Sequence, residues 1–508
     1  MIKKMLLAMA LCCAAIPAGA DRDLGEIDFP TSGGAEAQAH FERGVLWLHS
    51  FEYDDARAEF RRALEIEPGF FMAVWGEAMT YNYPVWAQQN PEEGRQALSR
   101  LGQSSRARLA KAPTTREGAY LAAVEALFGE GSKQERDLLY ADAMERLAAA
   151  HPEDLEAASF YALAILGTAD GDRDYSIYMR AGAVVEEVYA ANPRHPGALH
   201  YLIHSYDDPI HAPLGLRAAR RYAEVAPSAA HALHMPSHIF FALGDWQASE
   251  ASNVDSFDAA AARDRRNDHA LFWWHYSLLQ QGRFQEAAER LTFLVAALAE
   301  ASDARGRRHL AYMRAGHGIE TGDWPSLPGD LDPADLPAAA LATEAFALGY
   351  RALEAGDLAA AEGALAELRG MAGELAAGDA EALMAGQLEA LLLHRRGKSD
   401  RALEVLRAVA DAEDARSYDI GPPVPVKPSR ELLGELLLDA GQADAARREL
   451  ELALERQPNR SSVLRGLLRA ACAGGDGAER DAWSRRLAAN YVAADMAVKS
   501  RSGCSPAS

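Results

Sequence analysis

The 508-residue chain has little cysteine and little positive charge. Four cysteines are present, and Cys12 and Cys13 fall within the first twenty residues. Beyond that segment at most one disulfide is available, between Cys472 and Cys504. Lysine and arginine number 52 against 74 aspartate and glutamate residues, which gives a formal charge of −22. This acidic excess argues against partners such as nucleic acid or an anionic membrane surface.

A hydrophobic run long enough to cross a bilayer is also missing. The run from Met5 to Ile16 is about a dozen residues, whereas a spanning helix needs roughly 20. It follows two lysines and ends in small residues, a pattern typical of a cleaved export signal, with a retained membrane anchor as the alternative. We therefore expect residues 1–20 to be removed, and a mature periplasmic or secreted protein that begins near Asp21 and does not span a membrane.

Common catalytic signatures are absent as well. The sequence contains no H-E-x-x-H, no phosphate-binding loop, no G-x-G-x-x-G, no G-x-S-x-G and no C-x-x-C. We therefore expect no nucleotide cofactor, and the motifs leave open whether the protein is an enzyme.

The residues that are abundant favour helix. Hydrophobic residues make up 49% of the chain and charged residues 25%, with many alanine, leucine, glutamate and arginine residues. The segment "AHFERGVLWLHSFEYDDARAEFRRALEIEPG" spaces a set of small, apolar and turn residues that recurs near the C-terminus: Gly44, Ala56, Phe60, Ala63 and Pro68, then Gly434, Ala446, Leu450, Ala453 and Pro458.

This spacing resembles the tetratricopeptide repeat, a 34-residue helix-turn-helix, over roughly residues 37–490. The resemblance implies an all-α, right-handed solenoid of helical hairpins, in which each hairpin buries its apolar side against its neighbours. The expected organisation is a signal peptide (1–20), an N-terminal linker (21–36), two arrays (37–300 and 301–500) and a tail (501–508). The four-proline segment 418–429 is expected to be a stiff spacer, and a strap across the concave face is the alternative.

Histidine is concentrated in one region, with seven of the fifteen between His195 and His238. If successive repeats begin at Pro196 and Ala230, two H-x-x-x-H pairs occupy equivalent places in adjacent helices. The repeat family lines its concave groove with such positions, so the resemblance implies one groove-facing set: His200, His204, Asp207, His231, His234 and His238.

Four imidazoles from two helices are a common way to bind zinc, copper or iron. Asp207 or Asp208 would be a fifth ligand or would orient a ring. The alternative is that these histidines fill polar core positions and donate to backbone carbonyls. Pro236 also requires the helix that carries His238 to kink or to begin there.

Two interpretations, core packing and ligand binding, are open for a second group of residues. For Trp75, Glu77 and Met79 packing is the preferred interpretation, and an aromatic wall for a peptide or small ligand is the alternative. The groove and ligand candidates are Trp75, Glu77, Met79, Asp208, His269, His275 and Tyr276. In an oxidising compartment Cys472 and Cys504 would pair and tie down the tail, or else remain as two free thiols.

The string "HPGALHYLIHSYDDP…HALHMPSHIFFALGDW" is similar to a group of exported bacterial tetratricopeptide repeat proteins of unassigned activity. We predict an exported solenoid that binds a transition metal through the histidine cluster. One alternative is a metal-dependent enzyme with an open coordination position and Asp207, Asp208 or Glu77 as base. The other is a scaffold without metal that binds a protein or peptide partner in its concave groove.

Overall fold

The computed structural model describes residues 23–500 apart from 325–326, 328–330, 332–335 and 374–377. In the first half the helices are α1 (Ala35–His49), α2 (Tyr53–Ile66), α3 (Phe71–Met79), α4 (Pro91–Ser99), α5 (Ser105–Leu109), α6 (Thr115–Leu127), α7 (Lys133–Ala150), α8 (Leu155–Gly167), α9 (Tyr175–Ala191), α10 (Pro196–Tyr206), α11 (Ala212–Val225), α12 (Ala230–His234) and α13 (Pro236–Leu243).

The second half is also helical. Its helices are α14 (Trp246–Ala261), α15 (Asp268–Gln280), α16 (Phe284–Glu300), α17 (Ala304–Thr321), α18 (Ala338–Glu354), α19 (Leu358–Ala372), α20 (Ala380–Arg395), α21 (Ser399–Asp414), α22 (Ser429–Asp439), α23 (Ala443–Arg456), α24 (Ser461–Gly474), α25 (Gly477–Asn490) and α26 (Met496–Ser500). Within the described residues the strands are β1 (Asn82–Tyr83) and β2 (Gln88–Gln89), an antiparallel pair around the short 3-10 helix η1 (Pro84–Trp86). The prediction of an all-α fold without an extended sheet is confirmed.

The small residues of the repeat pattern lie where helices of a hairpin meet. A Cβ added to Gly44 on α1 would lie 2.6 Å from the ring of Phe60 on α2. Near the C-terminus, a Cβ on Gly434 would lie 2.5 Å from Cγ of Leu450. Any larger side chain would push these helices apart, so the repeated glycine sets the hairpin spacing in both arrays.

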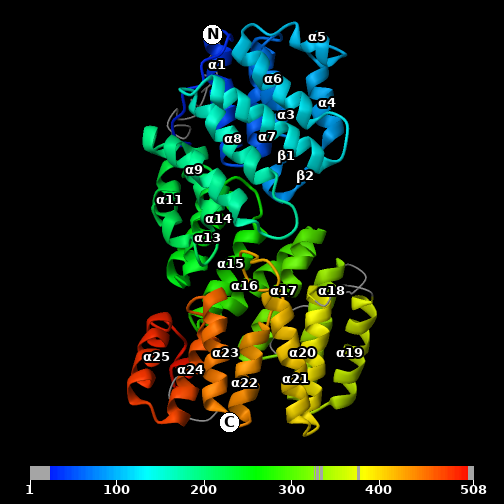
Figure 1. Cartoon of the computed structure of the whole chain (residues 1–508), viewed down its shortest axis with the longest axis vertical. Coiled ribbons are helices and arrows are strands. Elements are labelled where there is room, and N and C mark those ends of the chain that lie inside the picture. The colour runs from blue at the N-terminus through cyan, green and yellow to red at the C-terminus, as the bar shows by residue number, and fades with distance from the viewer. Residues whose placement is uncertain (1–22, 325–326, 328–330, 332–335, 374–377, 501–508) are drawn as a thin grey trace, which may run out of the picture.

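Consecutive hairpins stack along the chain into a solenoid that curls back on itself (Figure 1). Its last hairpins contact the middle of the chain, because the indole Nε1 of Trp246 donates to the Asn459 carbonyl over 2.9 Å. The backbone N–H of Ser461 donates to Oε1 of Gln280 over 2.9 Å, and that of Asp495 to the Gly282 carbonyl over 3.0 Å. The last hairpins therefore pack against α14, α15 and the turn that follows α15.

Residues 23–34 form no helix, yet they pack into the core of the first array. Leu24 and Phe29 are buried, and the Phe29 ring lies 5.2 Å from that of Phe41. The backbone N–H of Glu26 donates to the Arg194 carbonyl over 3.0 Å, which ties this segment to the start of α10.

The proline-rich segment is a strap and not a free spacer, which corrects the preferred interpretation. Ser417 accepts a hydrogen bond from the backbone N–H of Arg173, and Gly421 packs so closely on Trp273 that a Cβ there would lie 2.7 Å from the indole. Burial and the nearby Asp207 carboxylate raise the pKa of Tyr418. The strap thus covers the region between α10 and α15.

Several expectations concern residues outside the described part of the chain. The predicted signal peptide and the tail beyond residue 500 are among them, and so is Cys504. Its pairing with Cys472, which lies on α24, therefore stays a prediction. None of the described helices combines the length and the apolar character needed to cross a membrane.

Candidate metal centre

The helices that carry the histidines begin where the repeat length predicts. Helix α10 begins at Pro196 and α12 begins at Ala230, a separation of 34 residues. Helix α12 ends at His234, and α13 begins at Pro236, whose missing N–H and fixed φ suit the first turn of a helix. Of the two expectations for Pro236, a new helix is the one that the structure shows.

The histidines fall into two sets, and the second of them includes residues on both sides of this break. The first, here called the open set, consists of His200, His204 and His231, and one ring nitrogen of each lies within 4.8 Å of those of the other two. The second, here called the paired set, consists of His234, His238 and His269 and meets the same limit. The single four-histidine site expected from helical spacing is therefore replaced by two neighbouring three-histidine groups.

The open set presents bare ring nitrogens to one another. Nε2 of all three histidines is buried and has no hydrogen-bond partner. Nδ1 of His200 donates to the His49 carbonyl over 2.6 Å, and Nδ1 of His204 lies 3.5 Å from Oδ2 of Asp207. A neutral imidazole with its proton on Nδ1 has its lone pair on Nε2, which is the form that binds a metal.

Burial also keeps the open set uncharged. It lowers the pKa of His200, His204 and His231 by penalising the imidazolium form, and the neighbouring histidines lower the pKa of His200 and His231 further. Each buried nitrogen left without a partner costs about 1–3 kcal/mol. The arrangement is therefore expensive as packing alone, and a ligand that accepts three lone pairs would offset the cost.

Asp207 orients rings and does not point into the open set. Its Oδ2 accepts from Nδ1 of His238 over 3.0 Å, and its Oδ1 lies 2.8 Å from the Arg173 guanidinium. Although burial raises its pKa, Arg173 and the two histidines lower it far below the ordinary value, so the carboxylate is ionised. Of the two roles expected for Asp207, these contacts support the orientation of His204 and His238, and its carboxylate also lies within 4.8 Å of a ring nitrogen of each, so its role as a ligand stays a prediction.

Asp208 faces another direction. Its Oδ1 accepts from the backbone N–H groups of Ile210 and His211 over 3.0 and 3.1 Å, and the His211 ring also contacts its carboxylate. With these partners Asp208 shapes the turn into α11, and it offers no base to the open set.

Most of the candidate site is buried, and one histidine of each set, His231 and His269, is partly exposed. His200, His204, His234 and His238 are at most 7% exposed. Phe51 covers the open set, with its ring centroid 4.2 Å from that of His200, 5.5 Å from His231 and 5.9 Å from His204. The Phe51 ring therefore packs against every ring of the open set.

Phe51 holds this place through an unfavourable backbone conformation. It has φ 55° in the turn between α1 and α2, a region that favours glycine. In six other hairpins the residue just before the N-cap of the second helix is a glycine with φ between 68° and 77°: Gly244, Gly282, Gly356, Gly397, Gly441 and Gly475. The first hairpin alone in this series carries a large ring there, and that ring lies on the histidines.

Replacing Phe51 with glycine should therefore destabilise the protein less than an ordinary aromatic deletion. A left-handed non-glycine residue costs about 1–3 kcal/mol, and the substitution removes this cost while it removes the ring. In the matched control, Phe41→Ala on α1, we expect the full loss of about 3–5 kcal/mol. Denaturant unfolding measures both, and equal losses for the two variants would contradict backbone strain at Phe51.

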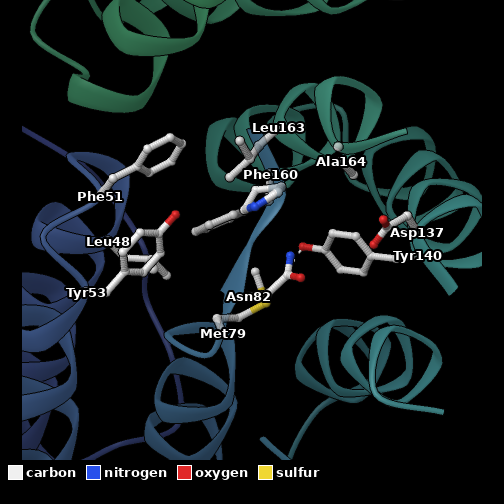
Figure 2. Close-up of a pocket in the computed structure, with 12 residues that line it drawn as sticks. Leu48, Phe51, Tyr53, Met79, Asn82, Asp137, Tyr140, Phe160, Leu163 and Ala164 are labelled. Atoms are coloured by element: carbon white, nitrogen blue, oxygen red, sulfur yellow. Dashed lines mark hydrogen bonds between the residues drawn. The ribbon is translucent and has the colours of Figure 1, made fainter. Parts of the chain in front are cut away.

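Phe51 also lines a mostly apolar pocket (Figure 2). Leu48, Met79 and Phe160 line it, and Tyr140 directs its hydroxyl to the sulfur of Met79 over 3.9 Å. The Tyr53 hydroxyl, which also lines this pocket, is buried without a partner. Phe51 therefore contacts both this pocket and the rings of the open set.

The remaining groove candidates lie in the core. Trp75 is fully buried among Phe29, Tyr120 and Phe160. Glu77 is buried and pairs with Arg61 over 2.7 Å, so it does not face the histidines as a base.

Two candidates from α15 lie farther along the array. Nε2 of His275 lies 3.3 Å from Nδ1 of His317, and burial lowers the pKa of His317 to about 4. The Tyr276 hydroxyl accepts a hydrogen bond from the buried Arg460. The partners of His275 and Tyr276 belong to neither histidine set, so these two side chains are not part of the candidate metal centre.

A third cluster escaped sequence reasoning because its members are far apart in the chain. The Glu156 carboxylate accepts from Nε2 of His49 over 2.7 Å and from Nε2 of His195 over 2.9 Å. Nδ1 of His49 lies 2.8 Å from the Tyr201 hydroxyl, and Nδ1 of His195 accepts the Ala198 N–H over 3.2 Å. Every ring nitrogen is engaged, so this cluster is a structural network and not a metal site.

The network is connected to the open set through His49, whose carbonyl oxygen contacts His200. Burial acts to raise the pKa of Glu156, but the adjacent His195 and His49 outweigh it and lower the pKa to about 2. The ionised carboxylate fixes His49, and the His49 carbonyl in turn accepts from His200. A structural cluster thus sets the tautomer of one candidate ligand.

Comparison with known proteins agrees with the repeat found in the sequence. Residues 37–70, which span α1 and α2, match the family described as tetratricopeptide repeat, so the chain carries such a repeat there. No curated protein matches the sequence of the chain.

Several solved structures are similar to it in shape. A human IFIT1 dimer with m7Gppp-AAAA is 13% identical, with 92% of each chain covered and a TM-score of 0.37. Yeast Tom70 is 10% identical, with 87% of this chain and 96% of that chain covered and a TM-score of 0.33. A tetratricopeptide repeat protein from Parabacteroides merdae is 15% identical, with 54% and 97% covered and a TM-score of 0.31.

Proposed function

We propose that the protein is an exported helical-repeat protein that binds a transition-metal ion through His200, His204 and His231. One observation carries the proposal: three buried Nε2 atoms without hydrogen-bond partners belong to rings whose nitrogens lie within 4.8 Å of one another. Imidazole nitrogen favours zinc, copper or iron over magnesium or calcium.

Packing alone accounts less well for this arrangement. In the network around Glu156 each histidine nitrogen has a partner, which shows how this chain satisfies a buried imidazole when no further ligand is needed. The open set differs, because Nδ1 of His200 and of His204 faces the His49 carbonyl and Asp207, while Nε2 of all three rings has no hydrogen-bond partner. Orientation of this kind is what a partner outside the first coordination sphere supplies at a metal site.

Three protein ligands leave a further coordination position for water or another ligand. Asp207 is engaged by Arg173 and His238, Asp208 by its own turn, and Glu77 by Arg61. Because these three carboxylates have other partners, metal binding is better supported than a catalytic role for them as bases. The helical array around the site offers surfaces to a protein or peptide partner, as repeat solenoids do.

Substitution of one ligand tests the proposal. His204→Ala removes a ligand, and because loss of an orienting group alone costs about 10- to 100-fold in affinity, we expect the dissociation constant for zinc to rise by more than about 100-fold. Calorimetric titration of untagged protein measures this. His394→Ala, on α20 and outside both sets, is the matched control and should bind as the wild type does.

Two outcomes would contradict the proposal. One is the lack of saturable binding of zinc, copper or iron by the wild-type protein. The other is equal affinity in wild type and His204→Ala, which would place any bound ion elsewhere. In either case the histidines would be packing residues and the protein a scaffold without metal at this site.

A further inference from the structure

We infer that the paired set, His234, His238 and His269, binds a second transition-metal ion beside the first. The inference rests on the proposed function for the class of ion, and on separate contacts for the site. It begins at His234, whose Nδ1 lies 2.7 Å from Oδ1 of Asn253. Because Nδ2 of Asn253 donates to the Ser249 carbonyl over 2.7 Å, its Oδ1 is an acceptor, and His234 must donate from Nδ1. The Nε2 lone pair of His234 is therefore free.

The same reasoning applies to His238. Its Nδ1 lies 3.0 Å from Oδ2 of Asp207, an ionised carboxylate that can only accept. The proton on Nδ1 is thereby assigned, and Nε2 points away from the carboxylate. Both histidines of the pair have their Nδ1 atoms fixed by acceptors on separate elements, Asn253 on α14 and Asp207 just after α10.

The two Nε2 atoms face each other at 3.2 Å. Two nitrogens that approach so closely, each with its other ring nitrogen used as a donor, must share either a proton or a cation. His269, on the first turn of α15, completes the set, since one of its ring nitrogens lies within 4.8 Å of those of the other two. Its ring centroid is 4.7 Å from that of His234. Three helices thus supply one imidazole each to the paired set, whereas the three rings of the open set come from two helices.

An indole packs against the paired set, in which His234 and His238 are buried and His269 is partly exposed. The indole of Trp273 stacks on His238 at 4.9 Å and meets His234 edge-on at 5.1 Å. Burial lowers the pKa of His234 to about 3 and the pKa of His269 well below its usual value. The positive charge of Arg305 lies near this set and would repel a bound metal ion. The carboxylates of Asp268 and Asp303 interact with the Arg305 guanidinium and partly balance its charge.

Asp207 connects the two sets. The same oxygen, Oδ2, contacts Nδ1 of His238 over 3.0 Å and Nδ1 of His204 over 3.5 Å. One carboxylate therefore orients a ligand of each ion. This contact makes the two sets parts of one centre with two ions, and it explains why a buried aspartate lies between two groups of histidines.

Metal stoichiometry tests the second ion. Full-length, untagged protein is titrated with zinc in a calorimeter, and the bound zinc is counted by mass spectrometry after desalting. We expect two ions per chain in the wild type and in the His394→Ala control. His269→Ala and His269→Gln should each retain one ion, and so should His231→Ala. Circular dichroism checks that each variant is folded.

The outcomes separate this inference from the proposed function. One ion in the wild type that is lost in His231→Ala but kept in His269→Ala would overturn the second ion and leave the proposed function standing. One ion that depends on both residues would also overturn it, because the six histidines would then share a single ion. Two ions in the wild type with one left in each variant would support it, and no bound zinc at all would end both ideas.

Discussion

Glu156→Ala is expected to lower the free energy of unfolding by about 3–5 kcal/mol. The carboxylate is fully buried and is the shared acceptor of His49 and His195, over 2.7 and 2.9 Å. Its removal leaves two buried imidazole N–H groups without an acceptor, in addition to a cavity between α1, α8 and the start of α10. Denaturant unfolding followed by circular dichroism measures the loss.

Glu153→Ala serves as the matched control, because Glu153 is exposed just before the same helix. We expect a change within about 0.5 kcal/mol for this variant. A Glu156→Ala loss as small as that of the control would show that the network is not structural. Its histidines would then have to be reconsidered as ligands.

Zinc at a thousand times its dissociation constant should stabilise the wild-type protein by about 4.1 kcal/mol for each ion that binds only the folded state. The stabilisation should be reduced in His204→Ala, which lacks a ligand of the open set, and retained in His394→Ala. The measurement is denaturant unfolding at fixed zinc concentration, with and without a chelator. The contrary result would be equal stabilisation of all three proteins, which would indicate zinc bound to unrelated surface residues.

The fold could be predicted because it depends on a local pattern. Gly44 and Phe60 touch in the first hairpin as Gly434 and Leu450 do near the C-terminus, so a fixed spacing in the sequence becomes a fixed helix contact. The same repeat length placed α10 and α12 at their observed starts, which brought the predicted histidines together.

The details of the site depend on contacts that no local pattern contains. Pro236 starts a new helix between His234 and His238, yet these two rings face each other, while His231 joins the histidines of α10. His269 comes from the next repeat and was expected to line the groove rather than to join the metal ligands. The cover over the site involves Phe51, 149 residues before His200, and a strap that contacts Trp273 through Gly421. Pairings over such distances follow from the tertiary fold and not from spacing.

The network around Glu156 is a further example. His49 and His195 lie in different repeats, and Glu156 is in neither of them. Each residue considered alone is an ordinary polar side chain. Only their convergence shows that the His49 carbonyl is held in place to accept from His200.

The most direct test of metal binding is X-ray diffraction from crystals of untagged protein purified from its native compartment, with data collected on both sides of the zinc, copper and iron absorption edges. An anomalous peak bounded by Nε2 of His200 and His204 and a ring nitrogen of His231 is the result we predict. Three imidazoles in the described arrangement without an anomalous peak between them, in protein saturated with each metal, would contradict it.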